Sequence, residues 1–479
     1  MDLAPARSGR GAPSALAAAI GLVLFAGILV LALDDPIAIL GAMGVAAAVL
    51  AVMNFPFSAL LLLLFLEPFH SAIKLGIQHK AGLPVGPLTY WKDALIVVLF
   101  VRGIAQRFLS DRRLNLGRDA GDYLLVFYVF AYVAMAVTSP SRGSVAVSLG
   151  LYVEGPLLFL AIRYFQLTRR QLAWCIVGLL TAATVMAAGA LIEQLGSQAR
   201  FVAWYGGHYA AEAQVAGRYR AGSFFTDYLV LAFYLAGAAP LAAAVATIRA
   251  RWRPAALLTF ALCVGGVLVT LSRAGYIGAG IGIVLALLLA VRNPAVRVSL
   301  VGGALVVAFA LSLQYFAPGN QTFSRTASNS LHITRVEQDL SLVAAKPFGY
   351  GLGSTDRPAR VIASSVAGAT ENIYMGKAID GGVQALVLYL VVVFLTGMRL
   401  RSSRRRALRA GDARGVALTA GALGAMAGVA VAGMFLGVDD LAINIVFWGA
   451  AAVALSWPIS DATVDLDLNP GAATVAPVA

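Results

Sequence analysis

The stretch that decides the architecture extends from Ala317 to Lys377, with the sequence APGNQTFSRTASNSLHITRVEQDLSLVAAKPFGYGLGSTDRPARVIASSVAGATENIYMGK. It is polar and charged, whereas the flanking segments Val298–Phe316 and Ala378–Met398 are long and apolar. About sixty residues are too many for a simple turn, and loops of this length are usually functional or disordered. Because the stretch also holds apolar patches and a glycine-rich run, it predicts a folded lid between two membrane spans.

The composition of the whole chain indicates an integral membrane protein. Of the 479 residues, 60% are hydrophobic and only 12% are charged. Repeated apolar runs of about 18 or more residues are typical of membrane helices. The alternation expected of barrel strands is absent, and helices satisfy their own backbone groups in hydrocarbon. We therefore predict an all-α, polytopic helical bundle with about 12–14 transmembrane helices.

Apolar runs divide the chain into spans from Ser14–Leu33 to Leu441–Trp457. The third and fourth runs, Phe57–Leu66 and Asp93–Gly103, are short and are interpreted as re-entrant or kinked segments. The basic segment Met1–Arg10 before the first apolar run resembles a signal peptide, but the run is long and lacks a clear small-x-small cleavage site, which favours a retained span. The predicted domain organisation is one transmembrane domain over residues 1–457, which includes the large periplasmic loop 317–377, and a disordered cytoplasmic tail over residues 458–479.

The net charge of +13 is explained by topology better than by nucleic-acid binding. Most of the 36 basic residues fall in the N-terminal segment and in every second loop, all of which lie on one side of the membrane in the predicted topology, as the positive-inside rule requires. This pattern predicts cytoplasmic N- and C-termini and places the large loop outside. In a bacterium that is the periplasmic face of the inner membrane. The basic run at residues 399–414 is interpreted as a topology signal, with contact to anionic lipid as the alternative.

Arg218, Arg220 and Arg273 lie at outer membrane boundaries, against this trend. A charge at membrane depth is costly and usually faces a cavity or an anionic partner. Arginine binds phosphate oxygens bidentately, so this group predicts a site for a lipid pyrophosphate. The alternative is that each arginine snorkels to lipid headgroups or pairs with a nearby acid.

Glu371 and Asn372 stand immediately before the span that begins at Ala378. A carboxylate there is placed to take a proton from an acceptor hydroxyl. The alternative, which does not exclude the first, is the N-cap region of a helix.

The remaining motifs do not predict catalytic or ligand-binding residues. The run Gly349–Gly353 predicts a tight turn with close backbone approach, not a nucleotide site. The four histidines show no paired metal-ligand spacing, so we predict neither a metal nor a cofactor. Cys175 and Cys263 lie in apolar runs and are predicted to be packing residues.

Four segments together resemble the O-antigen ligase and O-antigen polymerase superfamily. They are RYRAGSFFTDYLVLAFYL at 218–235, SRAGYIGAGIGIVLALLLA at 272–290, RVEQDLSLVAAKPFGYGLGS at 335–354 and TENIYMGKAIDGGVQALVLYLVVVF at 370–394. The resemblance covers about a third of the chain, and the four motifs occur in the family's order around one long loop.

The resemblance implies an inverting glycosyltransferase whose donor is an undecaprenyl-pyrophosphate-linked glycan. By position, Arg218 or Arg220, together with Arg273, would bind the pyrophosphate, and Arg335 would be the catalytic arginine of the loop. His332 and Asn372 are the residues expected to position the acceptor. The family's loop histidine is replaced by Glu371, which favours a polymerase over a lipopolysaccharide ligase and makes Glu371 the candidate base.

Other hypotheses remain open at this point. A ligase that transfers glycan to lipid A core or to another acceptor has the same residues. A transporter or flippase would show internal repeats and mid-membrane charges, and neither is evident in the sequence. A non-enzymatic scaffold for envelope assembly would tolerate single replacement of the arginines. The expected partners are the lipid-linked oligosaccharide, the bilayer and other polysaccharide assembly proteins, with no nucleic acid.

Overall fold

The computed structural model describes residues 49, 52–81, 91–111, 119–137, 139, 142–197, 199–200, 203, 214–215, 218–248, 250–299, 302–303, 326–355, 370, 372–435 and 440–459. The first predicted spans and the predicted tail from residue 460 onward lie outside these ranges.

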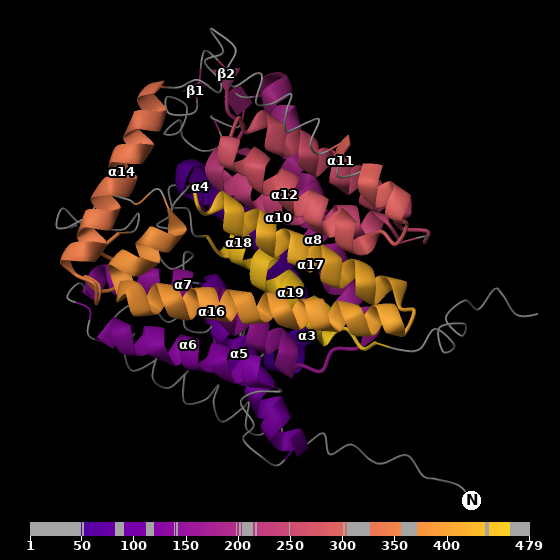
Figure 1. The fold of residues 1–479 in the computed structure, drawn as a ribbon. Helices are drawn as coiled ribbons and strands as arrows, with labels where there is room; N and C mark the ends of the chain where they lie inside the picture. Colours follow the sequence, from indigo (N-terminus) through magenta and orange to yellow (C-terminus); the bar gives the residue numbers. More distant parts are fainter. Residues whose placement is uncertain are drawn as a thin grey trace, which may run out of the picture.

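Helices dominate the described residues and pack into one bundle (Figure 1). The α-helices are α3 (Pro56–Leu66), α4 (His70–Ala81), α5 (Trp91–Asp111), α6 (Ala120–Val137), α7 (Arg142–Tyr164), α8 (Arg169–Ile192), α10 (Tyr228–Ala246), α11 (Arg253–Val269), α12 (Arg273–Ala290), α14 (Thr326–Ala345), α16 (Ile373–Arg409), α17 (Ala413–Ala432), α18 (Leu441–Asn444) and α19 (Ala450–Ser456). Between them lie η1 (Glu67–Phe69), η3 (Glu193–Ser197), η4 (Ser223–Phe225) and η5 (Ile445–Gly449). The strands β1 (Gln214–Val215) and β2 (Arg218–Tyr219) pair antiparallel.

Seven helical runs in the described ranges are long and apolar enough to cross a membrane. They are Pro56–Lys80, Ala120–Val137, Arg169–Gly196, Tyr228–Ala246, Arg273–Ala290, Ile373–Arg409 and Ala413–Ala432. Two shorter apolar helices, Arg253–Val269 and Leu441–Ser456, accompany them. The prediction of a polytopic helical membrane bundle is confirmed. The total of about 12–14 spans stays a prediction, because several predicted spans fall outside the described residues.

The third and fourth predicted segments are too short. The third continues past Leu66 through η1 and α4, so that Pro68 bends the helical run without ending it. The fourth is the 21-residue helix α5, which starts at Trp91 and includes Lys92. Most of the extra length lies after Gly103, where Arg107 is buried and lies over the Tyr164 ring of α7, 5.6 Å from its centroid. At the other end, Lys92 Nζ lies 3.2 Å from Glu154 Oε1 of α7.

The centre of the bundle is a close contact between α10, α12 and α17. Of the most apolar window of α10, 89% is buried by its neighbours. Glycines allow the backbones to approach: a β-carbon at Gly282 would lie 2.6 Å from the carbonyl oxygen of Gly424, and one at Gly278 would lie 2.5 Å from that of Gly428. These pairs make α12 and α17 antiparallel. The start of α12 therefore lies beside the end of α17.

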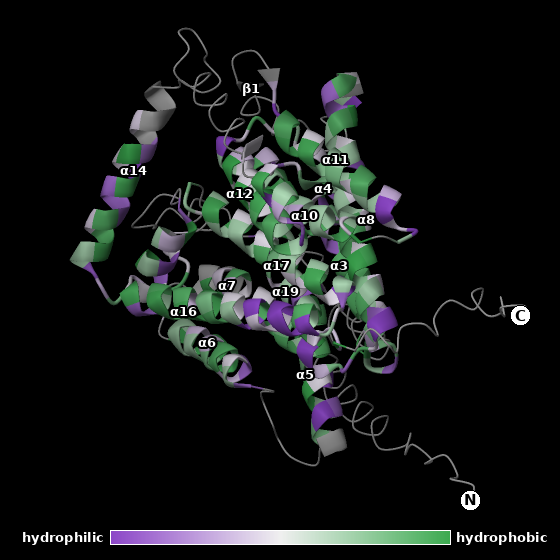
Figure 2. Ribbon diagram, turned by 45° about the vertical axis from the view of Figure 1, so that its right-hand side comes forward, coloured by the Kyte–Doolittle hydropathy of each residue, from purple (hydrophilic) through white to green (hydrophobic). Residues whose placement is uncertain are grey.

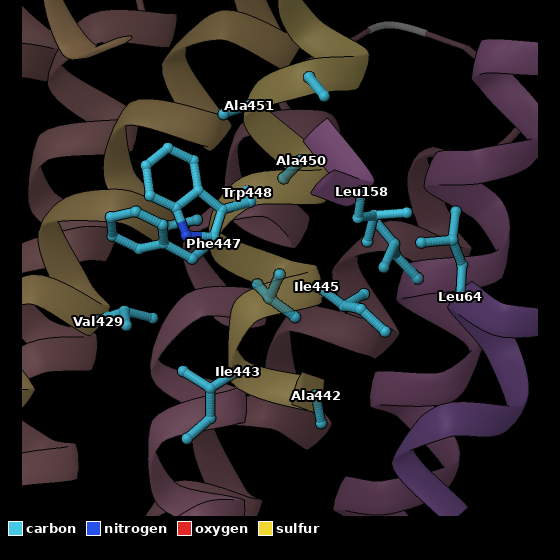
Figure 3. Packing of buried hydrophobic residues seen from close by; sticks show 14 of the residues in the cluster. Leu64, Leu158, Val429, Ala442, Ile443, Ile445, Phe447, Trp448, Ala450 and Ala451 are labelled. Atoms are coloured by element: carbon cyan, nitrogen blue, oxygen red, sulfur yellow. The ribbon is translucent and has the colours of Figure 1, made fainter. Parts of the chain in front are cut away.

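The C-terminal segment α18–η5–α19 fills the core beside α7 (Figure 3). Trp448 is almost fully buried, and its ring lies 6.1 Å from that of Phe159 in an edge-on arrangement. Gly155 of α7 provides the space for the indole. The predicted last span, Leu441–Trp457, is thus helical over Leu441–Ser456 and interior.

Helices α8 and α11 pack against each other at one side of the bundle. The hydroxyls of Thr184 and Thr259 share a hydrogen bond of 2.8 Å at this contact. Cys175 of α8 and Cys263 of α11 are buried free thiols, which confirms their interpretation as packing residues.

Helix α14 lies beside the bundle, apart from α10 and α12, in both views (Figures 1 and 2). It belongs to the polar stretch 317–377 and mixes polar and apolar positions, unlike the largely apolar bundle (Figure 2). Ile333 and Leu340 are exposed, whereas Asp339 is buried. The prediction of a folded segment in the large loop is confirmed for residues 326–355.

Glycine packing provides a direct test of the bundle's centre. Gly282→Ala places a methyl group against the Gly424 backbone and should destabilise the protein by about 1–3 kcal/mol. A thermal-unfolding measurement on the purified chain should show a lower Tm. Gly280→Ala, on the same helix, meets no atom within 4 Å and should not lower Tm. Equal losses in the two variants would contradict the close contact.

Candidate active site

One end of the bundle holds the predicted site residues Arg220, Arg273 and Asn372, and we call it the site end. Helix α12 begins there at Arg273, α17 finishes there, and α16 begins there at Ile373. The N–H of Ile373 donates to the carbonyl of Gly433 at 3.1 Å. Segments that are far apart in the chain are therefore joined by backbone contacts at the site end.

Asn372 is the N-cap of α16. Its Oδ1 accepts from the N–H groups of Tyr374 and Met375 at 2.8 and 3.2 Å, and its Nδ2 donates to the carbonyl of Met434 at 3.0 Å. The helix-cap interpretation is confirmed for this residue. Its predicted role in positioning the acceptor remains a prediction.

Arg220 is buried and held by backbone carbonyls. Its Nε donates to the Thr270 carbonyl at 3.0 Å and its Nη2 to the Leu271 carbonyl at 3.4 Å. The guanidinium also lies over the Tyr228 ring, 3.4 Å from the ring centroid. Because Thr270 and Leu271 lead directly to Arg273, these contacts bring the two arginines to the same turn.

Glu193 fixes the segment that carries Arg220. Its two carboxylate oxygens accept from the Tyr219 hydroxyl and from the Ser223 N–H, each at 2.7 Å. The Ala221 N–H also donates to the Val269 carbonyl at 3.2 Å. The Arg220 backbone is thus anchored on both sides. Glu193 was not among the predicted site residues.

Arg273 is the first residue of α12, after the N-cap Ser272, whose hydroxyl accepts from the Gly275 N–H at 3.3 Å. A cation is unfavourable at this end of a helix, because the free N–H groups already give it a partial positive charge. The combination of a helix start with two arginines suits an anion such as a phosphate.

His332 of α14 is half-buried and lies within electrostatic range of Arg273. Burial, with a further contribution from the charge of Arg273, lowers the pKa of His332 below its ordinary value. The histidine is therefore neutral at physiological pH. Residues of the large loop and of the start of α12 are thus within electrostatic range of each other.

Other residues of α14 are arranged differently. Arg335 is exposed, and its charge acts on Asp339. Asp339 is buried, its Oδ2 has no hydrogen-bond partner among the described residues, and burial raises its pKa to about 6. Sequence reasoning did not select Asp339. The sequence pattern that indicates Asp339 is its spacing from His332: seven residues, or two helical turns, place both on the same helix face.

The structure describes Arg218 in part and does not describe Glu371. Glu371 lies outside the described residues, although its neighbours Thr370 and Asn372 lie within them. The backbone of Arg218 belongs to β2, opposite Val215, but its side chain is outside the described set.

The glycine-rich run Gly349–Gly353 wraps around one carboxylate of α16, that of Asp380. Its oxygens accept from the hydroxyls of Tyr152 at 2.8 Å and Thr355 at 2.9 Å, and from the Ser354 N–H at 3.1 Å. A further, longer contact of 3.4 Å comes from the Gly353 N–H.

The backbone of this run requires glycine. Gly349, Gly351 and Gly353 have φ values of 90°, 102° and 87°. A β-carbon at Gly349 would lie 2.5 Å from the backbone nitrogen of Gly382, where α16 is kinked. The predicted tight turn with close backbone approach is confirmed. Asp380 therefore fastens the end of the α14 segment to the bundle.

The buried Lys377 and the half-buried Lys92 were not anticipated as interior charges from the sequence. Lys377 lies over the rings of Tyr152 and Tyr389, 4.1 and 4.6 Å from their centroids. Lys92 is close to the carboxylates of Glu154 and Asp93. Interior charge is thus more frequent than hydropathy indicated.

Residues 258–390 match the family model described as O-antigen ligase. The match covers a little over a quarter of the chain. The match contains Arg273, α14, the glycine-rich run and the first half of α16, and it confirms the resemblance to the O-antigen ligase and polymerase superfamily. No curated protein matches the chain. With its apolar spanning helices, the protein is a multi-pass membrane enzyme of the ligase or polymerase type.

The Asp380 contacts can be tested by amide hydrogen exchange. Asp380→Ala removes the acceptor for the Gly353 and Ser354 N–H groups, so exchange at 351–355 should accelerate by at least roughly tenfold, since each lost buried hydrogen bond costs about 1–3 kcal/mol. Tyr152→Phe removes one of the four contacts and should have a smaller effect. Unchanged exchange in Asp380→Ala would show that the run is held by other contacts.

Asp339 makes the packing of α14 dependent on pH. Its pKa of about 6 is above the ordinary value of about 3.9, so packing is strongest below pH 4 and weakens as the pH rises through 6. A spin label at the exposed position Ser341, introduced as cysteine, should be more mobile at pH 7.5 than at pH 5. The native cysteines are buried and should not react.

Asp339→Asn cannot ionise and is the matched control. Its label should have the same mobility at both pH values. A pH response that persists in Asp339→Asn would assign the effect to another group.

Proposed function

We propose that this protein is an inverting glycosyltransferase that transfers a glycan from undecaprenyl pyrophosphate to a sugar hydroxyl, most specifically as a polymerase of exopolysaccharide or O-antigen repeat units. The observation that carries the proposal is the position of Arg220 and Arg273 at one helix start within a chain that matches the O-antigen ligase family. We propose no metal or other cofactor for the reaction.

The chemistry follows from where charge develops. The acceptor oxygen forms a bond to the anomeric carbon while the bond from that carbon to the pyrophosphate oxygen breaks. Negative charge builds on the leaving phosphate. Arginines that are already oriented stabilise this charge without reorganisation. The carbonyl contacts of Arg220 and the helix start beneath Arg273 provide that orientation, and Arg218 is the further candidate for the same group.

The acceptor must lose a proton during the transfer. We assign this role to Glu371, whose chain neighbour Asn372 is fixed at the site end. His332 is neutral and close to Arg273, so it can donate or accept a hydrogen bond to an acceptor hydroxyl without adding charge. Arg335 on the same helix is proposed to act on the substrate when α14 closes over the site, as a lid that limits hydrolysis.

Polymerase is preferred to ligase for one specific reason. Glu371 occupies the place of the histidine that the family's ligases carry before the asparagine. A carboxylate base and a histidine base differ in charge, and the acceptor pocket must differ accordingly. A ligase that transfers the glycan to lipid A core or another acceptor is the second candidate, because the donor side of the two reactions is the same.

The orientation in the membrane is also a proposal. The short loops at the site end contain few basic residues. The segments at the opposite ends of α12 and α16 are rich in arginine. The positive-inside rule then places the site end in the periplasm and both termini in the cytoplasm of a bacterial inner membrane. A transporter is not favoured, because the family match and the anion site together point to group transfer.

The proposal is tested by deleting the gene and complementing it with variants at equal protein level. Arg273→Ala should lower glycan product by about 100-fold or more, since removal of one transition-state donor commonly costs 10²–10³ in rate. Arg273→Lys should restore only part of the activity, because lysine keeps the charge but not the fork. Arg170→Ala, at an exposed arginine at the start of α8, is the control.

The glycans distinguish the candidate activities. Single repeat units that accumulate on the lipid carrier, with long chains lost, identify a polymerase. Long chains that remain on the carrier but do not reach the final acceptor identify a ligase. Full complementation by Arg273→Ala would overturn the proposed role of the arginines.

A further inference from the structure

Five arginines gather at the end of the bundle opposite the site end, and we call them the arginine patch. They are Arg292, Arg297, Arg401, Arg404 and Arg405. Four of them lie close enough to Arg404 for their charges to repel its charge. Backbone carbonyls hold two of the side chains: Arg404 Nε donates to Leu289 O at 2.8 Å and Arg297 Nε to Val291 O at 2.7 Å. The patch therefore spans the end of α12 and the last turns of α16.

The patch differs from other arginines at the same end, because those arginines pair with carboxylates of the described residues. Arg399 pairs with Asp119 and Asp122 at 2.7 and 2.6 Å. Arg169 pairs with Asp412 at 3.4 Å. No carboxylate among the described residues forms an ion pair with any member of the patch. Five like charges held together without counter-charge are unfavourable unless an anion binds.

The position of the patch on α16 indicates which anion. One face of this helix is exposed and apolar, at Val383, Val387, Leu390, Val391, Phe394 and Met398. The same face continues, at the same helical spacing, with exposed Arg401 and Arg405. The opposite face, including Val392 and Leu400, is packed in the bundle.

The lengths agree with a bilayer boundary. From Val383 to Met398 the helix rises about 24 Å, most of the hydrocarbon thickness of about 30 Å. Arg401 is the next exposed position on the lipid-facing side. Its guanidinium group is thus at the depth of the phospholipid phosphates, directly below a face that acyl chains would cover.

We propose that the arginine patch is a binding site for the headgroup of an anionic phospholipid in the leaflet opposite the site end. The acyl chains pack on the exposed face of α16, and the phosphate is bound by Arg401 and Arg405, with Arg404 and the arginines after α12 completing the positive surface. Arginine suits this role because its planar fork pairs with two phosphate oxygens. Basic pockets between spanning helices bind anionic lipid in this manner.

The alternative without a specific lipid site is that these arginines act only as a topology signal during membrane insertion. In that case the folded protein would discriminate weakly between lipid headgroups. Its residual preference would depend on total charge and not on these positions.

Native mass spectrometry of the delipidated full-length protein tests the proposal. Dioleoyl-phosphatidylglycerol and dioleoyl-phosphatidylcholine are titrated separately, and the dissociation constant of each is measured. The Arg401→Gln/Arg405→Gln variant should bind phosphatidylglycerol roughly thirtyfold more weakly, at about 1 kcal/mol for each lost charge. Its binding of phosphatidylcholine should not change.

A matched control removes the same number of charges elsewhere at this end. Arg170→Gln/Arg414→Gln alters two exposed arginines outside the patch and should leave phosphatidylglycerol binding within about threefold of wild type. The conservative Arg401→Lys/Arg405→Lys variant should bind with intermediate affinity, because charge is kept and the fork is lost. Thermal unfolding of each variant verifies that it is folded.

Three results would overturn the proposal: equal losses in the patch and control variants, no loss in the patch variant, or equal affinity of wild type for the two lipids. The measurement uses no glycan donor, so it is independent of whether the proposed transferase activity is correct.

Discussion

The close approach of α10, α12 and α17 is the constraint on which the rest of the structure depends. Backbone-to-backbone contact at Gly278 and Gly282 leaves α12 little freedom to shift along α17. The start of α12 supports Arg273, and its end supplies the carbonyl that holds Arg404. One tightly packed helix thus determines the positions of positive charge at both ends of the bundle.

Backbone carbonyls hold arginines at the places where we propose that an anion binds. Carboxylates hold arginines at places where we propose no anion. The carbonyls of Thr270 and Leu271 hold Arg220 without cancelling its charge. Asp119 and Asp122, in contrast, neutralise Arg399. A carbonyl orients a guanidinium group without neutralising it, whereas a carboxylate also neutralises its charge.

The class of fold and a folded helix within the long polar stretch could be predicted from the sequence, because each leaves a strong local signal, whereas the donor-side role of the arginines stays a prediction. Apolar runs, a long polar interruption and arginines at an outer boundary can be recognised without knowing the partners. The contacts of Glu193 and Asp380 could not be recognised in this way. Glu193 lies 30 residues from Ser223, and Asp380 lies 228 residues from Tyr152, so only the folded chain brings these pairs together. The length of α5 was underestimated because hydropathy does not show that Arg107, beyond Gly103, is buried against Tyr164 of another helix.

The Asn372 contact to Met434 has a consequence for biosynthesis. The chain emerges from the ribosome with its N-terminus first. The segments with Arg220, Arg273 and α14 are therefore synthesised before α17. The start of α16 acquires its last anchor only when residues 433 and 434 have emerged and α17 has been inserted. A nascent or truncated chain therefore carries the arginines without the completed site. Competence to handle a lipid-linked sugar is thereby delayed until nearly the whole protein is in the bilayer.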